Sequence, residues 1–62
     1  MKVYVLQETW PDFIETSVYQ KREDAISALN KLVEEEGMEY YEDNEAEGEE
    51  IYAIVEEKEL NQ

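Results

Sequence analysis

Carboxylates dominate the reactive side chains of this 62-residue chain, which holds 18 Asp and Glu against five Lys and Arg. Thirteen of the acids lie between Glu34 and Glu59, where Lys58 is the only base. Residues 1–33, with five acids and four bases, carry a net charge of −1, and residues 34–62, with thirteen acids and one base, carry −12. The acidity is therefore a local feature of the second part of the chain.

Calcium binding is the first chemistry that such a cluster suggests. Asp43, Glu45, Glu47 and Gly48 match positions 1, 3, 5 and 6 of an EF-hand loop. Position 12 must be a bidentate Glu and is Ile54 here, and the flanking segments have the alternation of strands where an EF-hand needs helices. We therefore expect no metal site and no cofactor.

General acid–base catalysis is the second chemistry to consider. Two carboxylates act as a general acid and a general base where burial makes their pKa values differ. Runs of acids are instead typical of a solvated face. The chain has no Cys and no His, so it also lacks the usual thiol nucleophile and neutral-pH base. We expect a protein that is not an enzyme. The acids that would have formed the catalytic pairs are Glu34, Glu35, Glu36, Glu49 and Glu50.

High charge and low hydropathy are also typical of disordered chains, but the spacing of the apolar residues favours a fold. Hydrophobic residues make up 42% of the chain, and their period changes from two to nearly four and back to two. The prediction is one domain over residues 1–62, with 42–49 as a mobile acidic loop. No stretch has the apolar length of a secretory signal or a membrane span, so we expect a cytoplasmic protein.

The first part of the chain predicts a β-hairpin. Lys2–Glu8 is rich in β-branched and aromatic residues, Thr9–Asp12 contains the turn-forming Pro-Asp pair, and Phe13–Tyr19 alternates as a return strand.

A helix is expected next, over Arg22–Glu36, because its apolar residues recur at helical spacing and acids stand in its first turn. Gly37 suits a left-handed stop, after which Met38 returns toward Val33, while Lys21 offers no strong capping side chain.

A second hairpin is predicted to follow the helix. Met38–Glu42 and Glu50–Glu57 read as its strands, and Asp43–Gly48 reads as a water-exposed loop. The whole order predicts an α+β domain, with one helix packed on a mainly antiparallel sheet of three to four strands.

The alternation in the strands predicts which residues the helix covers. The β-branched set is expected under the helix, and an aromatic set on the other face, since one helix covers one face of a sheet. That second face either contains Tyr rings that merely suit half-exposed strands, or is a surface for a homodimer or another partner. Trp10 either folds back onto the core or stands out as an anchor. The set expected under the helix is Val3, Val5, Ile14, Val18, Ala53 and Val55, and the set expected opposite is Tyr4, Leu6, Tyr19, Tyr52 and Ile54.

Four stretches, Lys2–Val5, Val18–Tyr19, Arg22–Ile26 and Ile51–Glu56, together resemble the small ββαβ proteins that bacteriophages and other mobile elements encode. The resemblance implies the same α+β fold and a bacterial host cell, and it assigns no functional residue. Some small acidic phage proteins inhibit host defence nucleases, as anti-CRISPR or anti-restriction factors do. The acid-rich stretch after Gly37 is the feature that would place this chain among them.

Electrostatics then predicts the partner class. Dense negative charge repels nucleic acid and attracts the basic channels that hold DNA or RNA. We expect a binding protein that occupies such a channel as a nucleic-acid mimic, with no direct nucleic-acid or membrane partner; the alternative is a homo-oligomeric or regulatory domain whose acids only solubilise it. The predicted acidic face comprises Glu34, Glu35, Glu36, Glu39, Glu42, Asp43, Glu45, Glu47, Glu49 and Glu50, with Tyr40 and Tyr41 among them.

Overall fold

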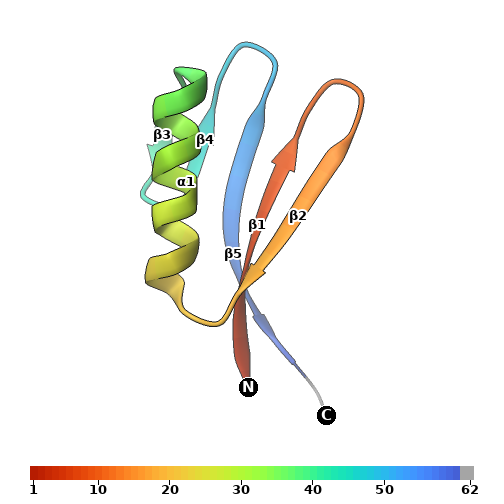
Figure 1. The fold of residues 1–62 in the computed structure, drawn as a ribbon, viewed down its shortest axis with the longest axis vertical. Coiled ribbons are helices and arrows are strands. Elements are labelled where there is room, and N and C mark those ends of the chain that lie inside the picture. The colour runs from red at the N-terminus through yellow and green to blue at the C-terminus, as the bar shows by residue number, and fades with distance from the viewer. Residues whose placement is uncertain (61–62) are drawn as a thin grey trace.

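Six elements make up the part of the chain that the structure, a computed structural model, describes, residues 1–60. The helix packs on one face of a five-stranded antiparallel sheet of order β2-β1-β5-β4-β3 (Figure 1). The predicted α+β class is confirmed, with one strand more than the upper number expected. The elements are β1 (Lys2–Thr9), β2 (Ile14–Tyr19), α1 (Arg22–Glu36), β3 (Glu39–Glu42), β4 (Glu45–Glu47) and β5 (Tyr52–Glu59).

The first and last strands lie next to each other in the middle of the sheet. β1 pairs with β5 over eight residues, and α1 carries the chain from β2 at one edge to β3 at the other. The β1–β2 loop, the β4–β5 loop and the end of α1 all lie at one end of the molecule, while the start of β1 and the end of β5 lie at the other end (Figure 1). No helix within residues 1–60 has the length and apolar character that crossing a membrane requires.

The helix has the predicted bounds and the predicted stop. Gly37 adopts the left-handed conformation with φ 65°, and the Met38 N–H donates to the Val33 carbonyl at 3.0 Å. This bond satisfies a carbonyl that the end of the helix would otherwise leave free. At the start, Lys21 makes no side-chain cap, as expected.

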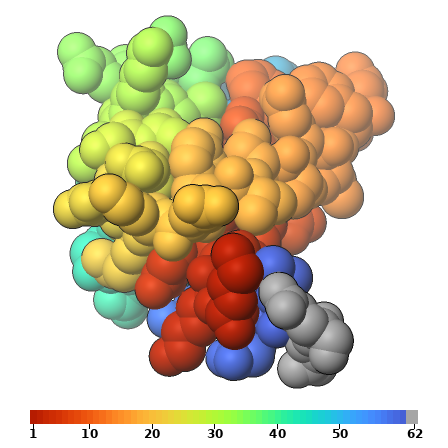
Figure 2. Space-filling view, turned by 60° about the horizontal axis from the view of Figure 1, so that its bottom comes forward, coloured from red at the N-terminus to blue at the C-terminus, as the bar shows by residue number. Residues whose placement is uncertain are grey.

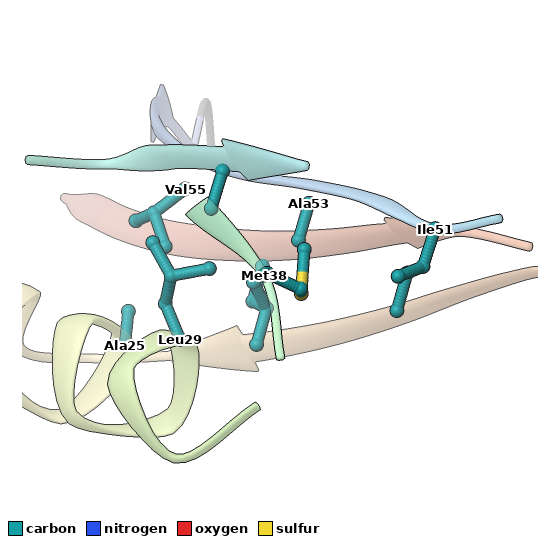
Figure 3. Close-up of a cluster of buried hydrophobic side chains, with 8 residues drawn as sticks. Ala25, Leu29, Met38, Ile51, Ala53 and Val55 are labelled. Carbon is teal, nitrogen blue, oxygen red and sulfur yellow. The ribbon is translucent and has the colours of Figure 1, made fainter. Parts of the chain in front are cut away.

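The core lies between α1 and the sheet. Ala25 and Leu29 point from the helix toward Ala53 and Val55 of β5, and Met38 fills the space beside them (Figure 3). Leu29 and Ala25 are fully buried. Small Ala side chains on both layers let the helix approach the sheet closely, so Leu29 is enclosed on all sides. The buried cluster consists of Leu6, Ala25, Leu29, Met38, Ala46, Ile51, Ala53 and Val55.

The predicted facing of the first hairpin is wrong. Leu6 is 3% exposed within the core cluster, and Tyr4 and Tyr19 pack against that cluster, so all three lie under the helix. The sheet register explains this result, because Leu6 pairs with Val55, and directly opposite residues share a face. The β-branched residues Val5 and Val18 pair with each other on the face away from α1.

The two faces were misread because both alternating sets of β1 are apolar, so periodicity alone does not separate them. Tyr rings also suit the rim of a core, where the ring is covered and the hydroxyl reaches water. Of the set expected opposite the helix, Tyr52 and Ile54 do lie on the open face, whereas Tyr4, Leu6 and Tyr19 do not. Of the set expected under the helix, Ala53 and Val55 are in the core, and Val3 is buried outside that cluster.

The expected loop over 42–49 is also wrong in its centre, because Glu45–Glu47 forms β4. Ala46 is fully buried and pairs with Ala53, and the Asn44 carbonyl accepts the Val55 N–H at 2.8 Å. The Asn44 side-chain amide in turn donates to the Val55 carbonyl at 2.9 Å. β4 has the sequence Glu-Ala-Glu, so it is stabilised by the buried methyl group of Ala46 and by the two hydrogen bonds between Asn44 and Val55.

Candidate acidic interface

The β3–β4 hairpin sets glutamates against glutamates. In its register Glu39 lies opposite Glu47, and Glu42 lies opposite Glu45, with a bulge between Tyr40 and Glu42. Like charges directly opposite each other destabilise a pair of strands. We call these four glutamates the acidic hairpin.

Cations do not neutralise the acidic hairpin within residues 1–60. The ion pairs there join Arg22 to Asp43 at 2.9 Å, the Met1 amine to Glu59 at 3.7 Å, Lys2 to Glu57 at 3.5 Å and Lys58 to Glu56 at 3.8 Å. Only the Arg22 pair touches the β3–β4 turn, and its acid is Asp43. The charges of the acidic hairpin are therefore left for solvent or for a partner.

Tyrosine hydroxyls form hydrogen bonds with two carboxylates of the acidic hairpin. The Tyr41 hydroxyl donates to a Glu47 carboxylate oxygen, and the Tyr52 hydroxyl donates to Glu45. These bonds hold the carboxylates without reducing their charge. The bond to Glu47 raises the pKa of Tyr41, and the bond to Glu45, with partial burial and the nearby charges of the same acids, raises the pKa of Tyr52 to about 12.

The raised pKa of Tyr52 predicts a loss of stability at high pH. An unperturbed Tyr releases its proton near pH 10, so between about pH 10 and pH 12 the folded chain holds a proton that the unfolded chain has lost. The contribution of Tyr52 to stability should therefore be fully present below pH 10 and should be lost as the pH rises toward 12. Urea denaturation across this range should show the fall, and Tyr52→Phe should reduce it.

The matched control for this experiment is Tyr4→Phe, which removes a hydroxyl that makes no hydrogen bond within residues 1–60 and should keep the wild-type pH profile. An equally steep fall in Tyr52→Phe and in the wild type would mean that the Tyr52–Glu45 bond does not exist in solution.

The remaining predicted acids gather at the loop end of the molecule. Glu34, Glu35 and Glu36 form the last turn of α1, which has no basic residue, so they face the negative end of the helix dipole. The structure brings Glu36 together with Glu49 and Glu50 of the β4–β5 loop around a hollow of about 330 Å³.

Trp10 forms one wall of this hollow. Its ring stacks on Phe13 with centroids 5.6 Å apart, its indole N–H donates to Glu8 at 3.1 Å, and it packs against the core cluster. Of the two readings of Trp10, the structure shows the first: the side chain folds back, and only part of it faces solvent.

A second hollow of about 430 Å³ lies between α1 and β3, beside the acidic hairpin. Tyr40 and Tyr41 line it, as does Ile26 of the helix, and the Tyr40 hydroxyl donates to Asn30. Glu42 and Asp43 also line it, so the hollow combines apolar walls with carboxylates. The sequence analysis named neither Asn30 nor Ile26 as a site residue, although the two lie one turn apart on the predicted helix.

The described residues thus define the class: an α+β domain with one edge made of closely spaced, unneutralised carboxylates and two exposed Tyr rings. No family model, curated protein or solved structure matches the chain. The case for a function lies in the charges, hollows and hydrogen bonds of this edge.

Proposed function

We propose that this protein is a small acidic binding protein that inhibits a nucleic-acid-binding protein or nuclease by occupying its basic channel in place of DNA or RNA. The observation that carries the proposal is the cross-strand pairing of Glu39 with Glu47 and of Glu42 with Glu45, none of which forms an ion pair with a residue of the described range 1–60. Such pairs lower the stability of a small domain, and acids placed singly would keep it equally soluble. A basic partner turns this unfavourable arrangement into a favourable one on binding.

The charge density of the chain matches one strand of nucleic acid. The molecule is 38 Å long and carries a net charge of −13, which is one charge per about 3 Å of its length. A single strand of duplex DNA carries one charge per about 3.4 Å, and both strands together one per about 1.7 Å. The density therefore favours a channel that holds a single strand over a groove that holds a duplex.

The hollow beside the acidic hairpin fits the side chains that line such a channel. Arg and Lys have apolar stems and charged tips, and Arg also stacks on aromatic rings. Tyr40 and Tyr41 offer the rings, and Glu42 offers the carboxylate. A basic side chain of the partner thus has a receptive site that combines both kinds of contact.

The resemblance to phage-encoded ββαβ proteins favours a bacterial host cell as the place where this activity occurs. In that setting the protein is cytoplasmic in a bacterial host, it is not an enzyme, and it acts stoichiometrically by competition. Its target is a restriction or CRISPR nuclease or another enzyme with a basic single-strand channel. Long-range attraction between the two charge fields gives fast association that weakens as salt is added.

The proposal is tested by binding to a target nuclease found by affinity capture, with a labelled single-stranded oligonucleotide as competitor. Glutamine at all four positions of the acidic hairpin should weaken binding by about 100-fold or more, because each neutralised acid leaves a partner cation unpaired. The wild-type affinity should also fall steeply between about 50 mM and 200 mM salt.

A matched control removes four acids elsewhere, by changing Asp12, Glu15, Glu23 and Asp24 to their amides. This control has the same net charge as the hairpin variant and should bind within about tenfold of the wild type, since distant charges act mainly on the association rate. Equal losses in both variants would show that only net charge matters. Binding of the protein and the oligonucleotide to the target at the same time would refute mimicry.

A further inference from the structure

The two edges of the sheet are built differently. β3, the edge strand on the acidic side, has four residues with a Glu at each end, and its pairing with β4 contains a bulge. β2, the other edge strand, has six residues that pair with β1 without interruption. Bulges, charges, Pro and short length are the usual means of protecting an edge from pairing with another chain. β3 has three of these features, whereas β2 has none beyond the single charge of Glu15.

The outer side of β2 is open within residues 1–60. No strand of that range pairs with it, and its atoms form the outer flank of the molecule in Figure 2 (orange, at the right). Its two large apolar residues on the open face, Ile14 and Val18, are 61% and 62% exposed. Val18 is exposed to this extent although Val5, the β1 residue directly opposite it, is half-buried.

We infer that β2 pairs with β2 of a second copy of this chain, in an antiparallel two-fold arrangement with Thr16 opposite its counterpart. A two-fold axis perpendicular to the sheet requires paired residues to share a face, and this register does so. It sets Ile14 opposite Val18 of the other copy, twice, and Glu15 opposite Ser17. The exposed apolar residues thereby cover each other, and no carboxylate lies opposite a carboxylate.

The self-complementary contacts of Ile14 and Val18 favour a second copy as the occupant of this edge, and the distribution of charge permits it. Two molecules of net charge −13 repel each other unless their acidic sides point apart. Pairing through β2 gives a ten-stranded sheet with β3 at both ends, and nine strand spacings of about 4.8 Å separate these ends by about 43 Å. This distance is several times the Debye length of about 8 Å at physiological salt. On the open face β1 and β2 present no charge, and β5 presents only the Glu56–Lys58 pair.

Sedimentation and light scattering test the dimer directly. The wild-type chain should show a mass of twice 7.4 kDa. On dilution, the mass should fall from that of the dimer to that of the monomer. Val18→Lys should weaken the association at least about tenfold, because it brings two ammonium groups next to the apolar contacts. Ser27→Lys on the exposed side of α1 adds the same charge and should leave the association unchanged. A wild-type mass of 7.4 kDa up to about 1 mM protein would overturn the inference.

A cross-link tests the register without relying on the folding of Val18→Lys. The chain contains no Cys, and directly opposite residues of antiparallel strands have Cα atoms about 4.5–5.5 Å apart, within the range that a disulfide bridges. Thr16→Cys should therefore oxidise to a covalent dimer with unchanged circular dichroism, whereas Ser27→Cys should not. Equal cross-linking of the two variants would refute the pairing. The inference does not depend on the proposed function, because both experiments need only the isolated protein.

Discussion

Lysine at positions 39 and 42 should make the fold more stable and should abolish binding to a basic partner. The register places these residues opposite Glu47 and Glu45, so each substitution turns a repulsive cross-strand pair into an attractive one. An opposite-charge pair contributes about 0.2–1 kcal/mol, and the lost repulsion adds a similar amount. The free energy of unfolding should rise by roughly 1–2 kcal/mol, which for a domain of this size raises the Tm by about 5–10 °C.

Thermal unfolding followed by circular dichroism measures the first effect, and titration against the captured target measures the second. Asp12→Lys with Glu23→Lys changes the net charge equally without facing another acid in the sheet. We expect little or no stabilisation from this control and only a modest loss of affinity. Opposite signs for stability and binding are the signature of acids retained for a partner. A loss of stability in Glu39→Lys/Glu42→Lys would contradict the β3–β4 register.

Leu29→Ala should unfold a large part of the population. Leu29 is fully buried, and it is the largest side chain so enclosed within residues 1–60. Truncating a buried Leu to Ala costs about 3–5 kcal/mol, because transfer energy is lost and a cavity remains. A 62-residue domain has a total stability of roughly 3–9 kcal/mol. The substitution therefore removes a third or more of what holds the fold.

Urea denaturation should show this loss as a lower midpoint with an unchanged slope. Leu60→Ala is the control, because Leu60 is exposed and its truncation should change stability by less than about 0.5 kcal/mol. Similar midpoints for Leu29→Ala and the wild type would mean that the helix does not pack on Leu6 and Val55 as described.

The helix could be read from the sequence because every signal that sets it is local. Its apolar spacing, the acids of its first turn and Gly37 all lie within the element or next to it, and its two ends are those expected. The hairpin of β1 and β2 was foreseeable for the same reason, since a turn joins its strands directly. Its strand bounds differ from those expected by one residue at one end of each strand.

The facing of β1 depended on a long-range pairing, and the existence of β4 depended on a strand register that the sequence pattern does not reveal. Leu6 is buried because Val55, 49 positions later, lies opposite it under the helix. β4 forms because Ala46 meets Ala53 and because Asn44 bonds to Val55. Leu6 and Val55 are too far apart for any local pattern to relate them, so alternation alone gave the wrong face for β1. The partners of β4 are near in sequence, but a strand of the composition Glu-Ala-Glu has no apolar alternation to reveal it, so the same reasoning gave a loop there.

The candidate site was predictable in composition but not in geometry. The run of acids after the helix identified the residues, and the structure divides them between the β3–β4 hairpin and the loop end near Trp10. The opposition of Glu39 and Glu47 and the Tyr52–Glu45 hydrogen bond both require the register of a strand that the sequence did not reveal.

The central position of β5 has a consequence for biosynthesis. β1 is synthesised before the other described elements, and its longest pairing is with β5, the last of these elements in the chain. Until β5 is complete, β1 can pair only with β2, and α1 lacks Ala53 and Val55, against which its buried residues pack. The nascent chain therefore has no stable partial structure. Assembly must therefore be a single late event after translation of residue 59, and a chain interrupted within β5 is expected to be cleared by proteases.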